Sequence, residues 1–339
     1  MMFKAVLLGQ WHSLSDPELE HSLITCIDFN LFCRFDELSI PDYSTLCRYR
    51  NWLAQDDTLS ELLELINRQL AEKNLKVEKA SAAVIDATII QTAGSKQRQA
   101  IEVDEEGQVS GQTTPSKDKN ARWIKKNGLY RLGYKQHTRT DEEGYIEKLH
   151  ITPANAHECK HLSPLLEGLP KGTTVYADKD YDSAENRQHL KEHWLQDGIM
   201  RKAHRKHPLT EAQTKRNRYL SKTRYVVEQS FGMLHRKFRY ARAAYFGLSK
   251  VSEQSHLKAM CLNLLKAANS FFAKVSIHVF SFWAAFLPPT GRLTQLQQLA
   301  RYQRQAYTCQ PINIKTWQQF HENIKYQSVK FHDSYESLL

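Results

Sequence analysis

The 339 residues predict an α/β protein, in which a mixed sheet flanked by helices follows a small all-helical domain. Residues 1–76 contain helical patterns and no strand pattern. From residue 77, short apolar runs rich in β-branched residues come first as three strands, and then alternate with helices. Residues 215–238 have apolar side chains at helical spacing, so a long helix with one buried face follows the strands.

Composition limits the classes of partner. The formal net charge of +10 favours a polyanionic partner, nucleic acid first and an anionic membrane surface second. The six cysteines form no C-x-x-C pair, which argues against structural zinc and fits a reducing, cytoplasmic compartment. Residues 271–287 are apolar but include Lys274 and His278, so we expect no membrane span.

The helical domain, residues 1–76, has clear helix starts. Ser15 begins a capping box, and Ser44 can cap a later helix that carries Arg48 and Arg50. Two short helices around a tight turn, the second one basic, are typical of a DNA-binding helix-turn-helix. A plain helical bundle that packs on the next domain explains the same pattern equally well.

The second predicted domain, residues 77–270, begins with a buried strand in KASAAVIDATIIQT. Residues 94–126 are polar and aperiodic and predict a long exposed insertion. A β-hairpin that turns at residues 141–144 follows. The remaining predicted elements are a helix from Asn155 to Leu166, a strand in GTTVYADKDY, a helix from Ser183 to about Trp194, and a strand in GIMRKA.

This order is three antiparallel strands followed by helix-linked parallel strands, which predicts a mixed sheet. The order matches the ribonuclease-H-like fold. A fold match does not by itself define a function, so the prediction of function depends on side chains.

Three acidic residues stand at positions of the predicted sheet where a ligand can bind. Asp86 lies within the first strand, Asp178 ends the fourth strand, and Glu228 lies on the last helix. Ligands of open α/β sheets bind at the carboxyl ends of the strands, so these three carboxylates can converge. Taken singly, each has a simpler explanation. Asp178 could be a helix N-terminal anion, as could Asp180 or Asp182, and Glu228 could pair with Arg224 one turn earlier.

Three carboxylates suit Mg²⁺, a hard cation that prefers oxygen ligands and shares substrate phosphate oxygens. Two such ions about 4 Å apart can activate a water or a 3′-hydroxyl and stabilise the leaving oxygen. The segment from Arg201 to Arg242 has 13 Lys and Arg against two acids, which suits binding of a DNA backbone.

Several blocks resemble one family in its own order. VIDATII, VYADKDYDSAENRQHL and RYVVEQSFGMLHRKFRYAR resemble the catalytic blocks of DDE transposases of the bacterial insertion-sequence-5 type. PDYSTLCRYRNWL and ITPANAHECKHLSPLL resemble the preceding domain and the intervening segment of that family. The resemblance implies that Asp86, Asp178 and Glu228 are the catalytic and metal-binding triad, with Arg224 as the arginine that precedes the glutamate.

The resemblance also implies a reaction and its partners. A metal-dependent transposase with two Mg²⁺ or Mn²⁺ ions would cut DNA at the terminal inverted repeats and join the ends to target DNA. It would act as a homo-oligomer on DNA in the bacterial cytoplasm, at the nucleoid. The expected DNA contacts are Arg224, Lys237, Arg236, His235, Arg216, Arg218, Lys215, Arg48 and Arg50. A nuclease on the same fold, and an inactive DNA-binding relic of a transposase, are the alternatives.

The chain departs from the family pattern in four places. Ser221 stands where the family often has tyrosine, and His235 stands where it often has lysine. The likeness already exists at residues 2–8, so we expect a truncated start. Residues 271–339 resemble nothing in the family, and we expect an atypical extension there, either read-through or a docking appendage.

Overall fold

The computed structural model describes residues 1–36, 39–77, 80–94, 99–103, 109–113, 118–126, 128–203 and 208–286. Side chains are described except in residues 95–117 and 272–286. Met1–Phe271 form one compact unit, and a second unit begins at Phe272. All features of the site lie in the first unit.

Helices make up the first part of the chain, as predicted. They are α1 (Met2–His12), α2 (Asp16–Thr25), α3 (Ile27–Cys33), α4 (Tyr43–Leu53) and α5 (Thr58–Glu72). The capping box at Ser15 is confirmed, because the Glu18 carboxylate accepts from the Ser15 backbone N–H at 2.8 Å. The predicted cap at Ser44 is wrong, since Asp42 caps α4 and accepts from the Thr45 N–H.

The arrangement of these helices supports the prediction of a helical bundle over that of a helix-turn-helix. Helix α3 ends at Cys33 and α4 begins at Tyr43, a longer connection than the three- or four-residue turn of that motif. Arg50 is only 5% exposed, and its guanidinium pairs with Asp16 and with Glu253. The expectation that Arg50 contacts DNA is therefore not retained, because its charge is used inside the protein.

Six described strands form the main sheet: β1 (Ala82–Gln91), β4 (Arg122–Lys126), β5 (Leu129–Thr140), β6 (Ile146–Pro153), β7 (Thr174–Ala177) and β8 (Gln196–Ile199). The order runs β6, β5, β1, β7, β8, with β4 also pairing β5. Strand β5 is antiparallel to β1, β4 and β6, whereas β7 is parallel to β1 and β8. The predicted mixed, ribonuclease-H-like sheet is confirmed.

Two segments differ from prediction. The expected aperiodic insertion, residues 94–126, contains β4 and a two-stranded sheet of β2 (Gln99–Val103) and β3 (Val109–Thr113). The expected helix from Asn155 to Leu166 is two short pieces, the 3₁₀ turn η1 (Glu158–His161) and α6 (Ser163–Leu166). Pro164 has no N–H to donate, so a helix cannot continue through it from η1, and it stands in the first turn of α6.

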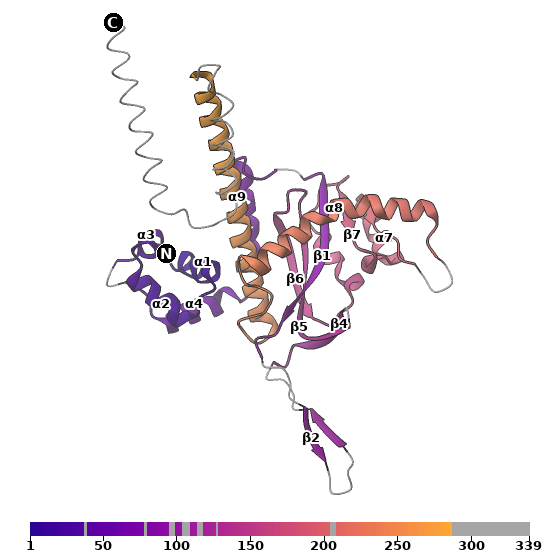
Figure 1. Cartoon of the computed structure of the whole chain (residues 1–339), viewed down its shortest axis with the longest axis horizontal. Coiled ribbons are helices and arrows are strands. Elements are labelled where there is room, and N and C mark those ends of the chain that lie inside the picture. Colours follow the sequence, from indigo (N-terminus) through magenta and orange to yellow (C-terminus); the bar gives the residue numbers. More distant parts are fainter. Residues whose placement is uncertain are drawn as a thin grey trace. The chain divides into compact units, whose positions relative to one another are not determined.

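Helices cover both faces of the sheet (Figure 1). The 3₁₀ turn η2 (Lys179–Tyr181) and α7 (Ala184–Glu192) link β7 to β8, and Ser183 caps α7 as predicted. Helices α8 (Glu211–Arg236) and α9 (Leu248–Phe286) follow. Helix α8 crosses β1, as Figure 1 shows.

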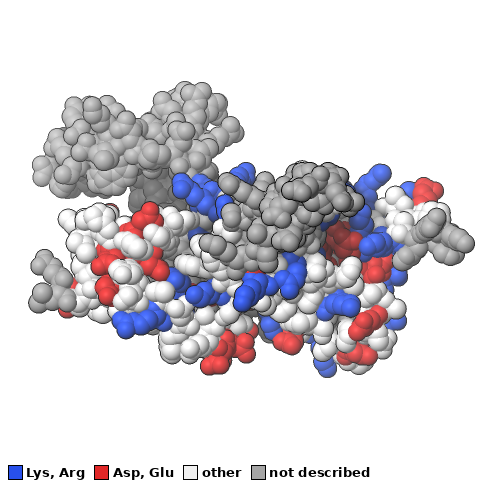
Figure 2. Space-filling view, turned by 90° about the horizontal axis from the view of Figure 1, so that it is seen from below, with Lys and Arg blue, Asp and Glu red and all other residues white. Residues whose placement is uncertain are grey.

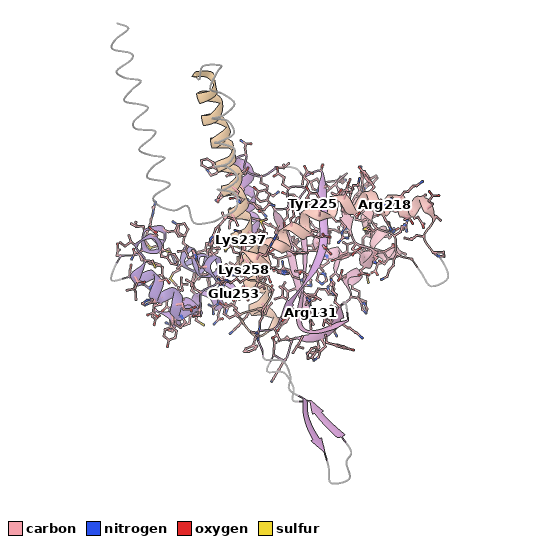
Figure 3. All side chains as sticks on the ribbon, in the orientation of Figure 1. Arg131, Arg218, Tyr225, Lys237, Glu253 and Lys258 are labelled. Carbon is pink, nitrogen blue, oxygen red and sulfur yellow. The ribbon has the colours of Figure 1, made fainter. Side chains whose placement is uncertain are left out.

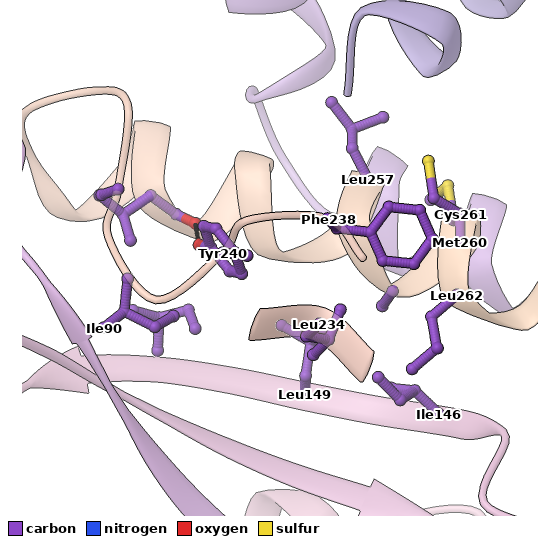
Figure 4. Close-up of a cluster of buried hydrophobic side chains, with 14 of the residues drawn as sticks. Ile90, Ile146, Leu149, Leu234, Phe238, Tyr240, Leu257, Met260, Cys261 and Leu262 are labelled. Atoms are coloured by element: carbon purple, nitrogen blue, oxygen red, sulfur yellow. Dashed lines mark hydrogen bonds between the residues drawn. The ribbon is translucent and has the colours of Figure 1, made fainter. Parts of the chain in front are cut away.

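Alternation along β1 divides the interior into two cores. Val84 and Ile90 pack with Val227, Phe231 and other residues of α8 and α9. Figure 4 shows part of this cluster. Ile85 points to the other face, where it packs with residues of α6, β7 and α7. Asp86 has the same parity as Val84, so it lies on the α8 face.

The helical part and the sheet share the larger core, because Val6 of α1 and Leu63 of α5 belong to it. The boundary at residue 76 therefore separates two patterns of secondary structure, while the core continues across it. None of the helices in the described part of the chain combines the length and apolar character that a membrane span requires.

Candidate active site

The two aspartates meet because two parallel strands are in register. Ile85 of β1 pairs with Ala177 of β7. Asp86 follows Ile85 within β1 and Asp178 follows Ala177 just after β7, so both residues lie at the carboxyl edge of β7. Asp178 directly follows its strand and accepts from the Lys179 backbone N–H at 2.6 Å.

Arg224 of α8 joins the two aspartates. Its Nη2 lies 2.8 Å from Asp86 Oδ2, and its Nη1 lies 3.4 Å from Asp178 Oδ1. The side chain is buried, with the whole residue 8% exposed. A planar guanidinium can contact two carboxylates at once, which a lysine ammonium does less well.

Burial and charge act against each other at this cluster. Burial raises the pKa of Asp86, and the charge of Arg224 and the Ala87 N–H only partly oppose this rise. Burial also works against the charge of Arg224, but the two aspartates outweigh it, so the pKa of Arg224 is raised. Asp86 is therefore a carboxylate that needs a cation beside it.

Glu228 lies one turn after Arg224 on α8 and is exposed. Its charge contributes to the raised pKa of Arg224. Within the described part of the chain, no ion pair joins the two side chains, so the simple i, i+4 explanation of Glu228 does not hold. Nor are any three His, Cys, Asp or Glu side chains of the described residues grouped as a ready metal site.

The neighbouring acids have cations of their own. Asp180 pairs with Lys202 at 2.9 Å, and this hydrogen bond lowers the pKa of Asp180. Asp182 pairs with Arg187 at 2.9 Å and accepts from the Lys202 backbone N–H. Neither contact involves Asp86. This supports Asp178, and not Asp180 or Asp182, as the acid that acts together with Asp86.

The donor set fits a hard divalent cation. Carboxylate oxygens from Asp86 and Asp178 already converge on one positive group, and Mg²⁺ prefers oxygen ligands of this kind. Arg224 Nε is buried and has no hydrogen-bond partner among the described residues. The guanidinium is therefore held mainly by its two aspartates.

The predicted DNA contacts fall into two groups. Arg218, Arg236, Lys237 and Arg48 are exposed, and Figure 3 labels Arg218 and Lys237. Lys215 is also exposed and pairs only with the exposed Glu211 of its own helix. The remaining two are partly buried: Arg216 donates to carbonyls of Ile199 and Asp197, and His235 lies 3.5 Å from Thr88. Arg216 holds α8 against β8, so its guanidinium has a structural role.

Sequence reasoning missed exposed aromatic residues near the predicted contacts. Tyr219 and Tyr225 of α8 are each more than half exposed beside Arg218 and Lys222. The sequence contained a signal for them, because both tyrosines lie outside the apolar stripe of this helix and next to basic residues. Strand β4 was missed for a different reason, because residues 122–126 were assigned to the insertion, whereas the strand that contains β5 was predicted.

Residues 78–264 match the family model described as "Transposase DDE domain". The chain belongs to the DDE transposases. Residues 1–52 match a second model, "Transposase domain (DUF772)". A "Transposase for insertion sequence element IS1106" from Neisseria meningitidis serogroup B is 90% identical over 229 residues, which cover 68% of this chain and 80% of that protein. The chain is thus a metal-dependent DNA transposase of the insertion-sequence type.

Two solved transposase structures are similar to this DDE transposase at low identity. A piggyBac transposase synaptic complex with hairpin DNA has a TM-score of 0.42 and 11% identity, covering 80% of this chain and 66% of that chain. A Mos1 transposase paired-end complex with the left transposon end has a TM-score of 0.22 and 10% identity, covering 74% and 78%.

Proposed function

We propose that this transposase cuts DNA at the ends of its insertion sequence and joins the 3′-hydroxyls to target DNA, with Asp86, Asp178 and Glu228 as the catalytic triad. The observation that supports this proposal is the contact of one guanidinium with both aspartates. That guanidinium comes from the helix that carries Glu228, so the three acids belong to adjacent elements.

Asp86, Asp178 and Glu228 would hold two Mg²⁺ or Mn²⁺ ions. When bound, such ions lower the pKa of an attacking water or 3′-hydroxyl and stabilise the leaving oxygen. Asp86 and Asp178 supply fixed carboxylates from two paired strands, and Glu228 supplies one from a solvent-facing position that DNA can reach. Arg224 neutralises the aspartates with both of its Nη atoms, so a contact between Arg224 and a phosphate requires that the guanidinium release a carboxylate.

The partners follow from this reaction. We propose that terminal inverted repeats and target DNA are bound in turn, and that a homo-oligomer holds the two ends together. The exposed cations remain in the proposed DNA-contacting set: Arg218, Arg236, Lys237, Arg48 and Lys215. DNA as substrate places the protein at the nucleoid, in the cytoplasm.

Three single substitutions test the triad: Asp86→Asn, Asp178→Asn and Glu228→Gln. Each keeps the size of the side chain and removes its charge. We expect each to lower Mg²⁺-dependent cleavage of DNA that carries the insertion-sequence ends by on the order of a thousandfold or more. Activity is compared at equal folded fraction, measured by thermal unfolding.

Asp180→Asn is the matched control, because Asp180 lies two residues from Asp178 and pairs elsewhere. It should cleave like the unmodified protein. Loss of cleavage in Asp180→Asn with retention in Asp178→Asn would reject the assignment. Products distinguish the nuclease alternative, since a transposase yields joined target DNA and a nuclease yields only hydrolysed ends.

A further inference from the structure

The β4–β5 hairpin is a second basic surface, separate from α8. Residues 119–131 contain five Lys and Arg and no Asp or Glu. Among these cations, Lys125, Lys126 and Arg131 form no ion pair with any acidic residue that the structure describes. The hairpin therefore presents uncompensated positive charge to solvent.

Packing does not explain the apolar residues at the tip of this hairpin. Leu129 and Tyr130 are 62% and 67% exposed, and four of the five residues of β4 are exposed. Lys125 Nζ lies 5.2 Å from the centre of the Tyr130 ring, so a cation and an aromatic face occur together. Gly128 has φ of 78°, the left-handed conformation that a tight hairpin turn needs.

Strand register relates the hairpin to the active site. Asp86 pairs with Thr138 of β5, and Tyr130 lies eight residues earlier on that strand. At about 3.4 Å per residue, the hairpin lies roughly 27 Å from Asp86 along the sheet. Eight base pairs of duplex DNA span about the same length, at about 3.4 Å per step.

The end of α8 lies between these two places. His235 contacts Thr88 of β1, two residues after Asp86. Burial and then the charge of Arg131 lower the pKa of His235, so Arg131 is near this helix end. Figure 3 labels Arg131 at the β4–β5 end of the sheet. Figure 2, seen from below that view, shows Lys and Arg side chains across the middle of the face and acidic side chains to either side.

We propose that the β4–β5 hairpin is a DNA-binding ribbon that holds duplex DNA about eight base pairs from the cleaved phosphate. Charge decides against pairing of this hairpin with the same hairpin of a second copy, because five cations without an acid would repel one another. A two-stranded ribbon fits a DNA groove, with Lys125 and Lys126 on phosphates and Leu129 and Tyr130 against the groove. The position of the cleaved phosphate rests on the proposed function.

The test compares Lys125→Gln/Lys126→Gln with Lys171→Gln. Lys171 is also an exposed lysine, but it precedes β7 and lies at the opposite end of the strands from the hairpin. Binding to a 30-base-pair duplex that carries the terminal inverted repeat is followed by fluorescence anisotropy from 50 to 200 mM salt, without divalent metal. Two lost phosphate contacts should reduce the slope of log K against log salt by about 1.8. Lys171→Gln should leave the slope unchanged.

A hydroxyl-radical footprint on the same duplex gives the location. We expect protection about eight base pairs inside the repeat end to disappear in the double variant and to remain in Lys171→Gln. An unchanged slope and footprint in the double variant would overturn the proposal. Tyr130→Ala, which keeps every charge, should weaken the footprint there without changing the slope. These assays measure DNA binding and not cleavage, so their results can be interpreted even if the assignment of the catalytic triad is wrong.

Discussion

At the residue scale, the decisive side chain is Arg224, because it neutralises two carboxylates of the proposed triad. Arg224→Gln would leave Asp86 buried beside Asp178 without a cation. We expect a loss of about 3 kcal/mol in the free energy of unfolding, typical of a broken buried ion pair. Chemical denaturation without divalent metal measures this loss.

Mg²⁺ should then stabilise Arg224→Gln more than the unmodified protein, because the variant offers two uncompensated carboxylates. The double variant Asp86→Asn/Arg224→Gln is the control, and it should lose most of this response. Equal responses of Arg224→Gln and the unmodified protein would show that the aspartates do not form a cation site.

At the scale of elements, three histidines from β5, β6 and η1 form a cluster that is absent from the proposed mechanism, with His137 buried and His150 and His161 half-buried. The His137 ring centre lies 4.9 Å from that of His161 and 6.2 Å from that of His150. Burial, helped by the charges of His161 and Lys135, lowers the pKa of His137 to about 3. Burial also lowers the pKa of His150 and His161.

These shifts predict acid sensitivity. Below pH 6.5 these histidines become protonated in the unfolded chain but stay neutral in the folded protein. The free energy of unfolding therefore falls as pH falls, down to about pH 3 for His137. His137 alone should contribute about 1.4 kcal/mol per pH unit in that window. His137→Gln should reduce the slope of unfolding free energy between pH 6 and 4.5 by that amount. An unchanged slope would mean that His137 is protonated in the folded protein.

At the scale of the whole molecule, the compact unit ends at Phe271. Leu262 of α9 belongs to the shared core, and Ala267 packs in a smaller cluster with Leu70 and Tyr145. A chain that ends at Phe271 should therefore fold, with a melting temperature close to that of the full chain in calorimetry. Failure of the shortened chain to fold, while the full chain folds, would show that the remaining residues complete the core.

Sequence alone determined the elements whose signals are local. The capping serines Ser15 and Ser183, the β-branched run of β1 and the apolar stripe of α8 all depend on neighbours within a few turns of chain. The order of these elements was enough to predict the sheet, since chirality and pairing rules leave few alternatives. Asp86, Asp178 and Glu228 could be selected in the same way, from their positions on predicted elements.

Only the tertiary structure decided which groups those charges contact. Arg224 could pair with Glu228 four residues away, but it contacts Asp86, which is 138 residues away. The sequence pattern predicted that Arg50 is exposed and contacts DNA, but in the structure it is buried against Asp16 and Glu253. A long side chain can reach partners on several elements, and burial determines which ion pair is stable. Both depend on packing between distant segments, which no local pattern contains.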